Sequence, residues 1–238
     1  MTEQTNKTLL PRGVNAANFE QAIAKFRKLL GEENVLIKDD QLIPYAKIMM
    51  AVDNAEHTPS AAVTATTVEQ VQGVVKICNE HKIPVWTIST GRNFGYGSAA
   101  PGQRGQIILD LKKMNKILHV DPELCTALVE PGVTYQQLYD YIQEHNLPLM
   151  LSFSAPSAIA GPLGNTMDRG VGYTPYGEHF LMQCGMEVVL ANGDVYRTGM
   201  GGVKGDTPGR YSSGGMARPW TGCSPKPTTV SARRWVFG

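Results

Sequence analysis

Residues 84–97 read PVWTISTGRNFGYG, and an apolar strand pattern in this run passes directly into a loop with three glycines. Glycine permits the positive φ angles that turn successive N–H groups into one concavity, and small residues let a bulky anion approach the main chain. The loop therefore suits a diphosphate group. By itself it is not specific, because it matches neither Gly-x-x-x-x-Gly-Lys-Ser/Thr nor a strict Gly-x-Gly-x-x-Gly.

Two further glycine-containing segments follow strand patterns. EPGVT at residues 130–134 ends a strand and enters a helix, so its free N–H groups would face whatever lies over the strand end. Residues 155–177 read APSAIAGPLGNTMDRGVGYTPYG and show no convincing helix or strand pattern. A loop of this length in a compact domain is usually functional or disordered, and its tyrosines and prolines argue against disorder. Within it, Asp168 and Arg169 form either a surface ion pair or a ligand-positioning pair.

Helix and strand patterns alternate along the chain as far as residue 206. Apolar spacing predicts helices after Asn18, Thr67 and Thr134, the last two each with a glutamine three residues later, as in a capping box. Strands are predicted at 61–65, 83–89, 107–111 and 125–129, and a hairpin at 186–198 with a type I′ turn at Asn192-Gly193. The sequence therefore predicts an α+β fold.

Composition excludes several classes of protein. The 238 residues carry 22 Lys and Arg against 21 Asp and Glu, a net charge of +1, which gives no electrostatic argument for nucleic acid or an anionic membrane. No window holds eighteen apolar residues, and residues 1–7 lack the layout of a secretory signal. We expect a soluble protein, cytoplasmic or periplasmic. The four cysteines and five histidines are scattered, which predicts free thiols and no metal site.

Residues 207–238 have a different composition. They contain five basic residues and no acidic one, and 17 of the 32 residues are Gly, Pro, Ser or Thr. Their apolar residues follow neither a period of 2 nor one of 3.6. We expect residues 1–206 to form the folded domain and residues 207–238 to form an unstructured tail.

Four long runs together resemble flavoenzymes of the vanillyl-alcohol oxidase and p-cresol methylhydroxylase group. They are residues 84–97, 129–134, 164–179 and 185–193, within a resemblance that covers roughly residues 15–205. The resemblance implies an FAD-binding domain made of two small α/β subdomains, with a boundary near 115–150. It also implies a substrate-capping domain that this sequence does not contain, and a full-length form that is a homo-oligomer.

The resemblance also implies where FAD lies. The first loop and the long third segment would line its diphosphate and ribityl chain, and a strand near Glu187 would add backbone contacts. The implied cofactor-binding residues are Ser89, Thr90, Gly91, Arg92, Asn93, Gly95, Pro131, Gly132, Val133, Pro156, Ser157, Gly161, Gly164, Asn165, Asp168, Arg169, Gly170, Tyr176, Gly177, Glu187 and Val188.

One catalytic residue is implied. In the family, a tyrosine at the position of Tyr96 helps to hold the substrate phenol as phenolate, so that the electron-rich ring stabilises the benzylic cation left by hydride transfer to flavin. Ser157 stands where the oxidase branch carries an acidic residue, which favours a dehydrogenase of a 4-alkylphenol that passes electrons to a cytochrome c. Two alternatives stay open: a vanillyl-alcohol or eugenol-type oxidase that reduces oxygen, and a non-catalytic nucleotide-binding remnant.

A change of reading frame would explain the tail. If the codons are read one base earlier, Met216-Ala217 forces Gly, Trp220-Thr221 forces Asp and Trp235-Val236 forces Gly, whatever synonymous codons are used. The other shifted codons permit a run that resembles the segment with which the family continues. Our hypothesis is that residues 207–238 are out of frame and that the chain is truncated. We then expect weak, non-covalent FAD binding and little or no turnover.

Overall fold

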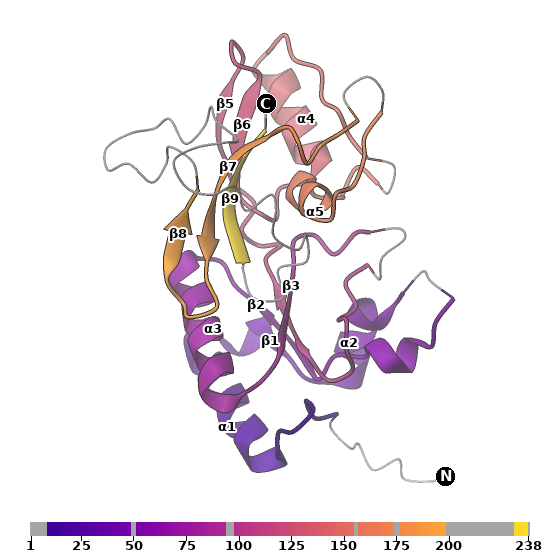
Figure 1. Cartoon of the computed structure of the whole chain (residues 1–238), viewed down its shortest axis with the longest axis vertical. Coiled ribbons are helices and arrows are strands. Elements are labelled where there is room, and N and C mark those ends of the chain that lie inside the picture. Colours follow the sequence, from indigo (N-terminus) through magenta and orange to yellow (C-terminus); the bar gives the residue numbers. More distant parts are fainter. Residues whose placement is uncertain are drawn as a thin grey trace.

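The computed structural model describes residues 9–48, 51–93, 98–154, 157–173, 177–198 and 231–237. They form two sheets, which lie in separate halves of the molecule in Figure 1. The chain passes from the first sheet to the second between Asp110 and Ile117. The α+β class predicted from the sequence is therefore what the structure shows.

The first sheet has the strand order β1-β2-β4-β3. Its strands are β1 (Val35–Leu36), β2 (Ala61–Thr64), β3 (Val85–Ile88) and β4 (Ile107–Asp110). The last three are parallel to one another, and β1 joins β2 antiparallel at the edge. Because the carboxyl ends of parallel strands share one edge of a sheet, the glycine loop after β3 and the turn after β4 leave from the same side.

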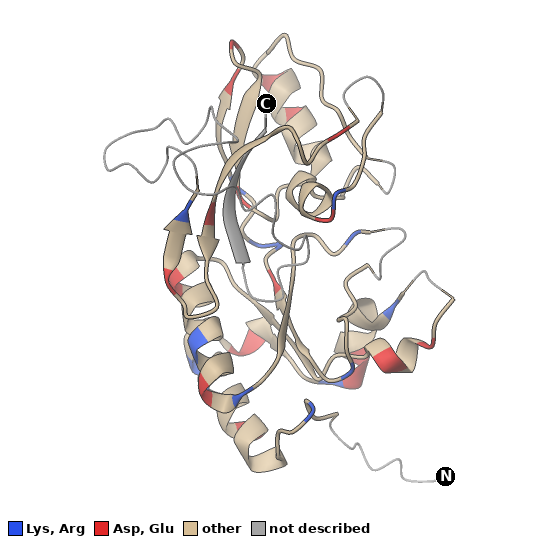
Figure 2. Cartoon of the chain, in the orientation of Figure 1, with Lys and Arg blue, Asp and Glu red and all other residues tan. Residues whose placement is uncertain are grey.

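Helices cover both faces of this sheet. They are α1 (Ala16–Leu30), α2 (Asp39–Ala46) and α3 (Val68–His81), with short 3₁₀ turns at Glu32–Asn34 and Asn54–His57. α1 and α3 pack against one face and α2 against the other, which is why β2 and β4 are buried along their whole length. Figure 2 shows acidic and basic residues interspersed along α1 and α3, so that neither helix presents a stripe of one sign.

Two of the three predicted helix caps lie where the sequence places them. Thr134 and Gln137 form a full capping box at α4 (Tyr135–Glu144), and the Thr67 side chain caps α3. The prediction for α1 was wrong: Asn15 caps that helix, and Asn18 instead binds the far end of α3. The Asn18 amide donates to the carbonyl oxygen of His81 over 2.9 Å, which ties the two helices together.

A buried carboxylate holds the edge from which the loops leave. Asp110, at the end of β4, is 1% exposed and accepts hydrogen bonds from the Tyr45 hydroxyl over 2.6 Å and from the Lys112 backbone N–H over 2.9 Å. Lys112 also places its ammonium 2.9 Å from the same carboxylate. Burial, together with the negative charge of Asp110, raises the pKa of Tyr45 to about 12. The hydroxyl therefore stays protonated as the donor.

The second sheet is antiparallel and has the strand order β5-β6-β9-β7-β8. The bounds of its strands are β5 (Ile117–Asp121), β6 (Thr126–Val129), β7 (Gln183–Val189), β8 (Val195–Arg197) and β9 (Ser231–Phe237). α4 and α5 (Pro162–Met167) share an apolar core with β6 and β7. Within the described part of the chain, no helix is both long and apolar enough to cross a bilayer.

The predicted hairpin is present as β7 and β8, but its turn differs from the prediction. Only Gly193 has a positive φ angle, of 88°, whereas a type I′ turn needs two such residues. The Gly193 N–H donates to the Leu190 carbonyl oxygen, and the Leu190 N–H donates to the carbonyl oxygen of Asp194, each over 2.8 Å. The loop is therefore three residues long, with a single left-handed glycine at its end.

The prediction of an unstructured tail is wrong for residues 231–237. They form β9, which lies between β6 and β7 and runs antiparallel to both. A strand in this central position hydrogen-bonds to the backbone of both neighbours. It therefore leaves neither β6 nor β7 with an unpaired edge on that side. Residues 199–230 and Gly238 lie outside the described residues.

Candidate functional site

The three glycine-containing segments meet at one place, which we call the three-loop junction (residues 89–93, 130–134 and 157–170). The Ser89 hydroxyl donates to the Pro131 carbonyl oxygen over 2.5 Å, which joins the first segment to the second. A Cβ atom added to Gly161 would lie 2.6 Å from that hydroxyl oxygen, and one added to Gly164 would lie 3.2 Å from the Ser89 Cβ. The third segment therefore touches the same serine.

A second contact closes the junction on the other side of the first loop. The Asn93 amide donates to the Asp168 carboxylate over 2.9 Å. The neighbouring Arg169 places its guanidinium over the Phe180 ring, 4.1 Å from the ring centroid. Asp168 and Arg169 thus act on different parts of the structure: one positions the first loop, and the other anchors the third segment to the residues before β7.

The first loop presents a row of backbone donors. Among the described residues, nothing accepts a hydrogen bond from the backbone N–H groups of Thr90, Gly91 and Arg92. Gly91 has a φ angle of 68°, and alternation with a left-handed residue is what turns consecutive N–H groups toward one point. A row of backbone donors with no acceptor among the described residues, next to a left-handed glycine, fits the diphosphate of a dinucleotide cofactor.

The second segment positions the junction but offers no N–H donors of its own to a ligand. The Gly132 N–H donates to Met114, and the N–H groups of Tyr135 and Gln136, at the start of α4, donate to Ala160 and Ala158. The expectation of free donors at this strand end was therefore wrong. The third segment accepts only from the first two N–H groups of α4, and this contact fixes α4 against the third segment.

The third segment contains a helix that the sequence pattern did not indicate. α5 begins at Pro162, a residue that favours the first helical turn because it has no N–H to leave unpaired. The N–H groups of Leu163 and Gly164, in that first turn, have no acceptor among the described residues. They add to the unused donors of the first loop, because Gly164 lies against Ser89.

The other predicted site residues make contacts of a different kind. Glu187 and Val188 belong to β7, which is paired with β8 on one side and β9 on the other, and the Glu187 carboxylate, 3% exposed, binds Arg197 over 2.5 Å. The Ser157 hydroxyl accepts from the N–H of Ile159. The predicted catalytic Tyr96 and the predicted cofactor residues Gly95, Pro156 and Tyr176 fall outside the described residues.

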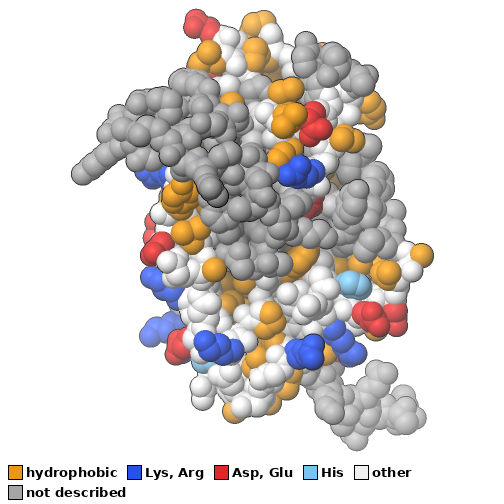
Figure 3. Space-filling model, viewed as in Figure 1, with side chains coloured by type: hydrophobic (Ala, Val, Ile, Leu, Met, Phe, Trp, Pro, Cys, Tyr) orange, Lys and Arg blue, Asp and Glu red, His pale blue; other side chains and the backbone are white. Residues whose placement is uncertain are grey.

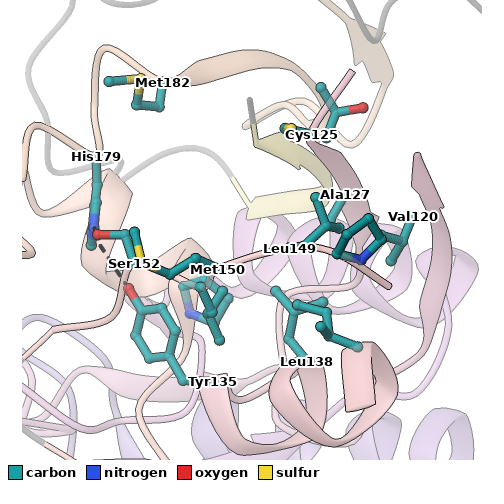
Figure 4. Close-up of a pocket in the computed structure, with 15 residues that line it drawn as sticks. Val120, Cys125, Ala127, Tyr135, Leu138, Leu149, Met150, Ser152, His179 and Met182 are labelled. Atoms are coloured by element: carbon teal, nitrogen blue, oxygen red, sulfur yellow. Dashed lines mark hydrogen bonds between the residues drawn. The ribbon is translucent and has the colours of Figure 1, made fainter. Parts of the chain in front are cut away.

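A histidine that sequence reasoning did not single out connects four segments next to the junction (Figure 4). His179 is 6% exposed, and its Nδ1 lies 2.6 Å from the Asn165 side-chain oxygen and 3.5 Å from the Tyr135 hydroxyl. Its Nε2 lies 2.9 Å from the Ser152 hydroxyl. No spacing in the sequence signals this cluster, because its members come from α4, α5 and two loops. Among the described residues, no group of three possible metal ligands occurs.

His179 should make the stability of this region depend on pH. Burial lowers the pKa of the His179 imidazole in the folded protein, partly offset by Glu178. The folded state then binds fewer protons than the unfolded state. The contribution of His179 to the free energy of unfolding is therefore complete above the unfolded pKa of about 6.5, and it is lost as the pH falls below that value. We expect the melting temperature to drop more between pH 7 and pH 5 in the parent chain than in His179→Gln.

A matched control for this comparison is His145→Gln. His145 is exposed and stacks on Tyr141 at the end of α4, away from the Asn165 and Ser152 contacts. Its replacement should leave the parent's dependence of melting temperature on pH intact. An unchanged dependence in His179→Gln would show that the histidine contributes nothing to it.

Comparison with known proteins places the described geometry among flavoproteins. A family described as FAD binding domain matches residues 59–199. The chain is 80% identical over 205 residues to the 4-cresol dehydrogenase [hydroxylating] flavoprotein subunit of Pseudomonas putida, which covers 86% of this chain and 39% of that protein. It is 35% identical over 192 residues to 1'-carboxy-chondrochloren decarboxylase of Chondromyces crocatus, covering 81% of this chain and 35% of that protein.

Two solved structures share the fold closely. A crystal structure of p-cresol methylhydroxylase with substrate bound has a TM-score of 0.92 at 70% identity, and 4-ethylphenol oxidase from Gulosibacter chungangensis has a TM-score of 0.91 at 36% identity. Each comparison covers 96% of this chain and 44% of the solved chain. The chain therefore spans about two fifths of the length of these relatives.

Proposed function

The chain belongs to the FAD-binding domain family, with FAD as its cofactor, and we propose that it is the FAD-binding part of a longer flavoprotein that oxidises a 4-alkylphenol. Membership confirms the fold and the cofactor predicted from the sequence. The alkylphenol substrate rests on one observation above all, the 80% identity to a 4-cresol dehydrogenase flavoprotein subunit over 205 residues.

The described residues of the junction fit the cofactor. The unused N–H groups of Thr90, Gly91 and Arg92, together with those at the start of α5, would bind the diphosphate oxygens. Ser89 and Pro131 hold the first loop in place, and Asn93 is held by Asp168. When bound, FAD supplies a two-electron acceptor for hydride. The chain's own part is to orient that acceptor through the main chain.

The substrate would be held by residues beyond the first loop. Tyr96 follows Asn93 by three positions, so a cofactor held by the loop backbone would lie near the tyrosine. We propose that Tyr96 stabilises the phenolate form of the substrate, because only an electron-rich ring can stabilise the benzylic cation that hydride loss leaves. Ser157, in place of an acidic residue, supports a dehydrogenase that passes its electrons to a cytochrome c subunit. The full-length form is proposed to be a homo-oligomer.

The test is turnover of a restored protein. We would fuse residues 1–198 of this chain to the corresponding remainder of the Pseudomonas putida subunit and measure oxidation of 4-methylphenol with an artificial electron acceptor. We expect acceptor-dependent turnover roughly 100-fold or more above that of the chain alone, because the fusion adds the part of the relative that lies beyond the matched residues and can orient the substrate. Turnover with oxygen that equals turnover with the artificial acceptor would favour the oxidase alternative. The similarity to 4-ethylphenol oxidase is the observation that supports this alternative. Full turnover by the chain alone would contradict the proposal.

We propose that residues 207–238 arise from a single-base change of reading frame. In support, the alignment with the 80% identical relative extends over 205 of the 238 residues. The encoding DNA between Asp206 and Arg210 decides the matter, because an intact frame there, with no base gained or lost, excludes the proposal.

A further inference from the structure

The first loop ends at Asn93, and two hydrogen bonds fix that residue. Its side-chain amide donates to the Asp168 carboxylate over 2.9 Å, and its main-chain carbonyl oxygen accepts from the Ser98 hydroxyl over 3.0 Å. Asp168 belongs to the third segment, whereas Ser98 lies five residues after Asn93 in the same stretch of chain. Asn93 is therefore held both by its side chain and by its backbone.

The same loop is also fixed at its other end, where the Ser89 hydroxyl donates to the Pro131 carbonyl oxygen. Between the two fixed ends lie Thr90, Gly91 and Arg92, whose backbone N–H groups have no acceptor among the described residues. Donors that are held in place before a ligand arrives bind it with a smaller loss of conformational entropy. The residues that fix the two ends can thus change the affinity for a ligand that they do not touch.

Ser98 has a backbone conformation that costs energy. Its φ angle is 52°, in the left-handed region that residues other than glycine rarely adopt. In this conformation its hydroxyl reaches Asn93. The next residue, Ala99, is 6% exposed, and a Cβ atom added to Gly91 would lie 2.9 Å from the Ala99 Cβ. The left-handed turn at Ser98 therefore leads the chain back against the middle of the donor row.

Asp168 has the wrong charge for direct contact with a diphosphate. The carboxylate and the diphosphate are both negative, so they repel each other at short distance. The same carboxylate is a strong acceptor for the Asn93 amide, because hydrogen bonds to charged groups are stronger than those between neutral groups. A role in holding Asn93 therefore fits the chemistry of Asp168 better than the direct cofactor contact that the resemblance implies.

The Asp168 contact adds little to the stability of the fold. Asp168 is exposed, and Figure 3 shows that charged side chains of both signs reach the surface on the face viewed there. Water and neighbouring charges weaken an exposed polar pair, so pairs of this kind contribute little to the free energy of unfolding. An effect of Asp168 on cofactor binding can therefore be measured separately from an effect on folding.

We propose that Asp168 and Ser98 are positioning residues for FAD. Together they hold Asn93, and with it the end of the donor row, in the geometry that the diphosphate requires. Neither residue needs to touch the cofactor. The inference rests on the proposed function, because it concerns how the three-loop junction holds FAD. It deepens that function by giving a role to Ser98, which was not among the predicted cofactor residues, and a different role to Asp168.

Exchange of the two polar groups tests the Asp168 contact. Asp168→Ala should weaken FAD binding by the chain roughly tenfold, with a melting temperature within about 2 °C of that of the parent. Asn93→Asp should weaken binding roughly 30-fold, because two carboxylates then face each other. Asn93→Asp combined with Asp168→Asn restores an amide–carboxylate pair with its polarity reversed, so the affinity should return to within roughly threefold of the parent's.

Two results would overturn the role of Asp168. One is a combined variant that binds FAD no better than Asn93→Asp alone. The other is an Asp168→Ala chain that binds FAD as tightly as the parent or more tightly, which is the result expected if the carboxylate faced the diphosphate directly.

Ser98→Gly separates positioning from stability. Glycine adopts the left-handed conformation without strain, so the melting temperature should stay within about 2 °C of the parent's. Loss of the hydroxyl should nevertheless weaken FAD binding roughly fivefold. Lys82→Gly is the matched control, because Lys82 also has a left-handed φ angle, of 56°, but lies at the end of α3. Its replacement should leave the affinity for FAD unchanged, and an equally unchanged affinity in Ser98→Gly would contradict the proposal.

Titration of FAD against the quenching of flavin fluorescence gives all of these dissociation constants, and circular dichroism confirms that each variant is folded. A parent chain that binds no FAD would contradict both the proposed function and this inference. A parent chain that binds FAD, with an affinity that Asp168→Ala and Ser98→Gly leave unchanged, would overturn this inference alone.

Discussion

Gly161→Val weakens FAD binding by the chain at least roughly 100-fold, which corresponds to about 2.8 kcal/mol at 1.4 kcal/mol per tenfold. Even a Cβ atom at Gly161 would lie 2.6 Å from the Ser89 hydroxyl oxygen and 3.0 Å from the Thr90 methyl carbon. The branched side chain of valine extends further into the same space. Ser89 must then move, and its 2.5 Å hydrogen bond to the Pro131 carbonyl oxygen breaks.

The loss of FAD affinity follows from the position of Thr90, which is next to Ser89 in the first loop. Thr90 opens the row of unused N–H groups in the first loop, so a shift of its backbone moves the donors that would face the diphosphate. The dissociation constant is measured by titrating FAD against the quenching of flavin fluorescence, with circular dichroism to confirm that the variant is folded.

Gly164→Ala is the matched control for this substitution. Its Cβ would lie 3.2 Å from the Ser89 Cβ, a distance that a movement of a few tenths of an ångström relieves. We expect its affinity for FAD to stay within roughly threefold of that of the parent. An unchanged dissociation constant in a folded Gly161→Val chain would show that FAD binding does not depend on the close approach of the first and third segments.

Gly132→Ala unfolds the domain at a much lower temperature than the parent. Its Cβ would lie 2.3 Å from the Lys112 carbonyl oxygen and 2.7 Å from that of Leu111, and both are backbone atoms that cannot rotate away. The Gly132 N–H is also bound to the Met114 carbonyl oxygen. We expect a loss of about 3 kcal/mol or more in the free energy of unfolding, because a clash between two backbone segments has no cheap relaxation. Thermal unfolding should register this as a fall of roughly 6–12 °C.

Gly13→Ala separates the clash from ordinary backbone strain. Gly13 has a φ angle of 79° but nothing within 4 Å of an added Cβ, so alanine there meets only the cost of a left-handed conformation. That cost is about 1 kcal/mol. A Gly132→Ala chain that melts no lower than Gly13→Ala would show that the turn between β6 and α4 does not require close packing against residues 111–112.

Much of the fold could be predicted because its signals are local. The capping box of Thr134 and Gln137 and the hairpin at β7 and β8 depend on residues a few positions apart, and the structure contains both. α5 was missed because a helix of six residues, the first of them a proline, is too short to show a helical period. β9 was missed because the central strand of a sheet is selected by its neighbours more than by its own composition.

The site could be predicted only in outline, because its details are long-range. The glycines marked the first and third segments, but whether an N–H group is free depends on the fold. The donors of Tyr135 and Gln136 are taken by Ala160 and Ala158, more than twenty residues later. The His179 cluster likewise joins residues that are 14 to 44 positions apart. Spacing in the sequence carries no information about such contacts.

The central claim is that backbone N–H groups at the three-loop junction hold FAD, and equilibrium binding to the purified chain tests it most directly. The chain is incubated with FAD, passed through a gel-filtration column equilibrated with the same flavin, and compared with the Gly161→Val variant. The account predicts one FAD per folded parent chain, released on denaturation because the binding is non-covalent, and far less on the variant. A folded parent chain that holds no flavin at ~1 mM FAD, where even millimolar affinity would be seen, would contradict it.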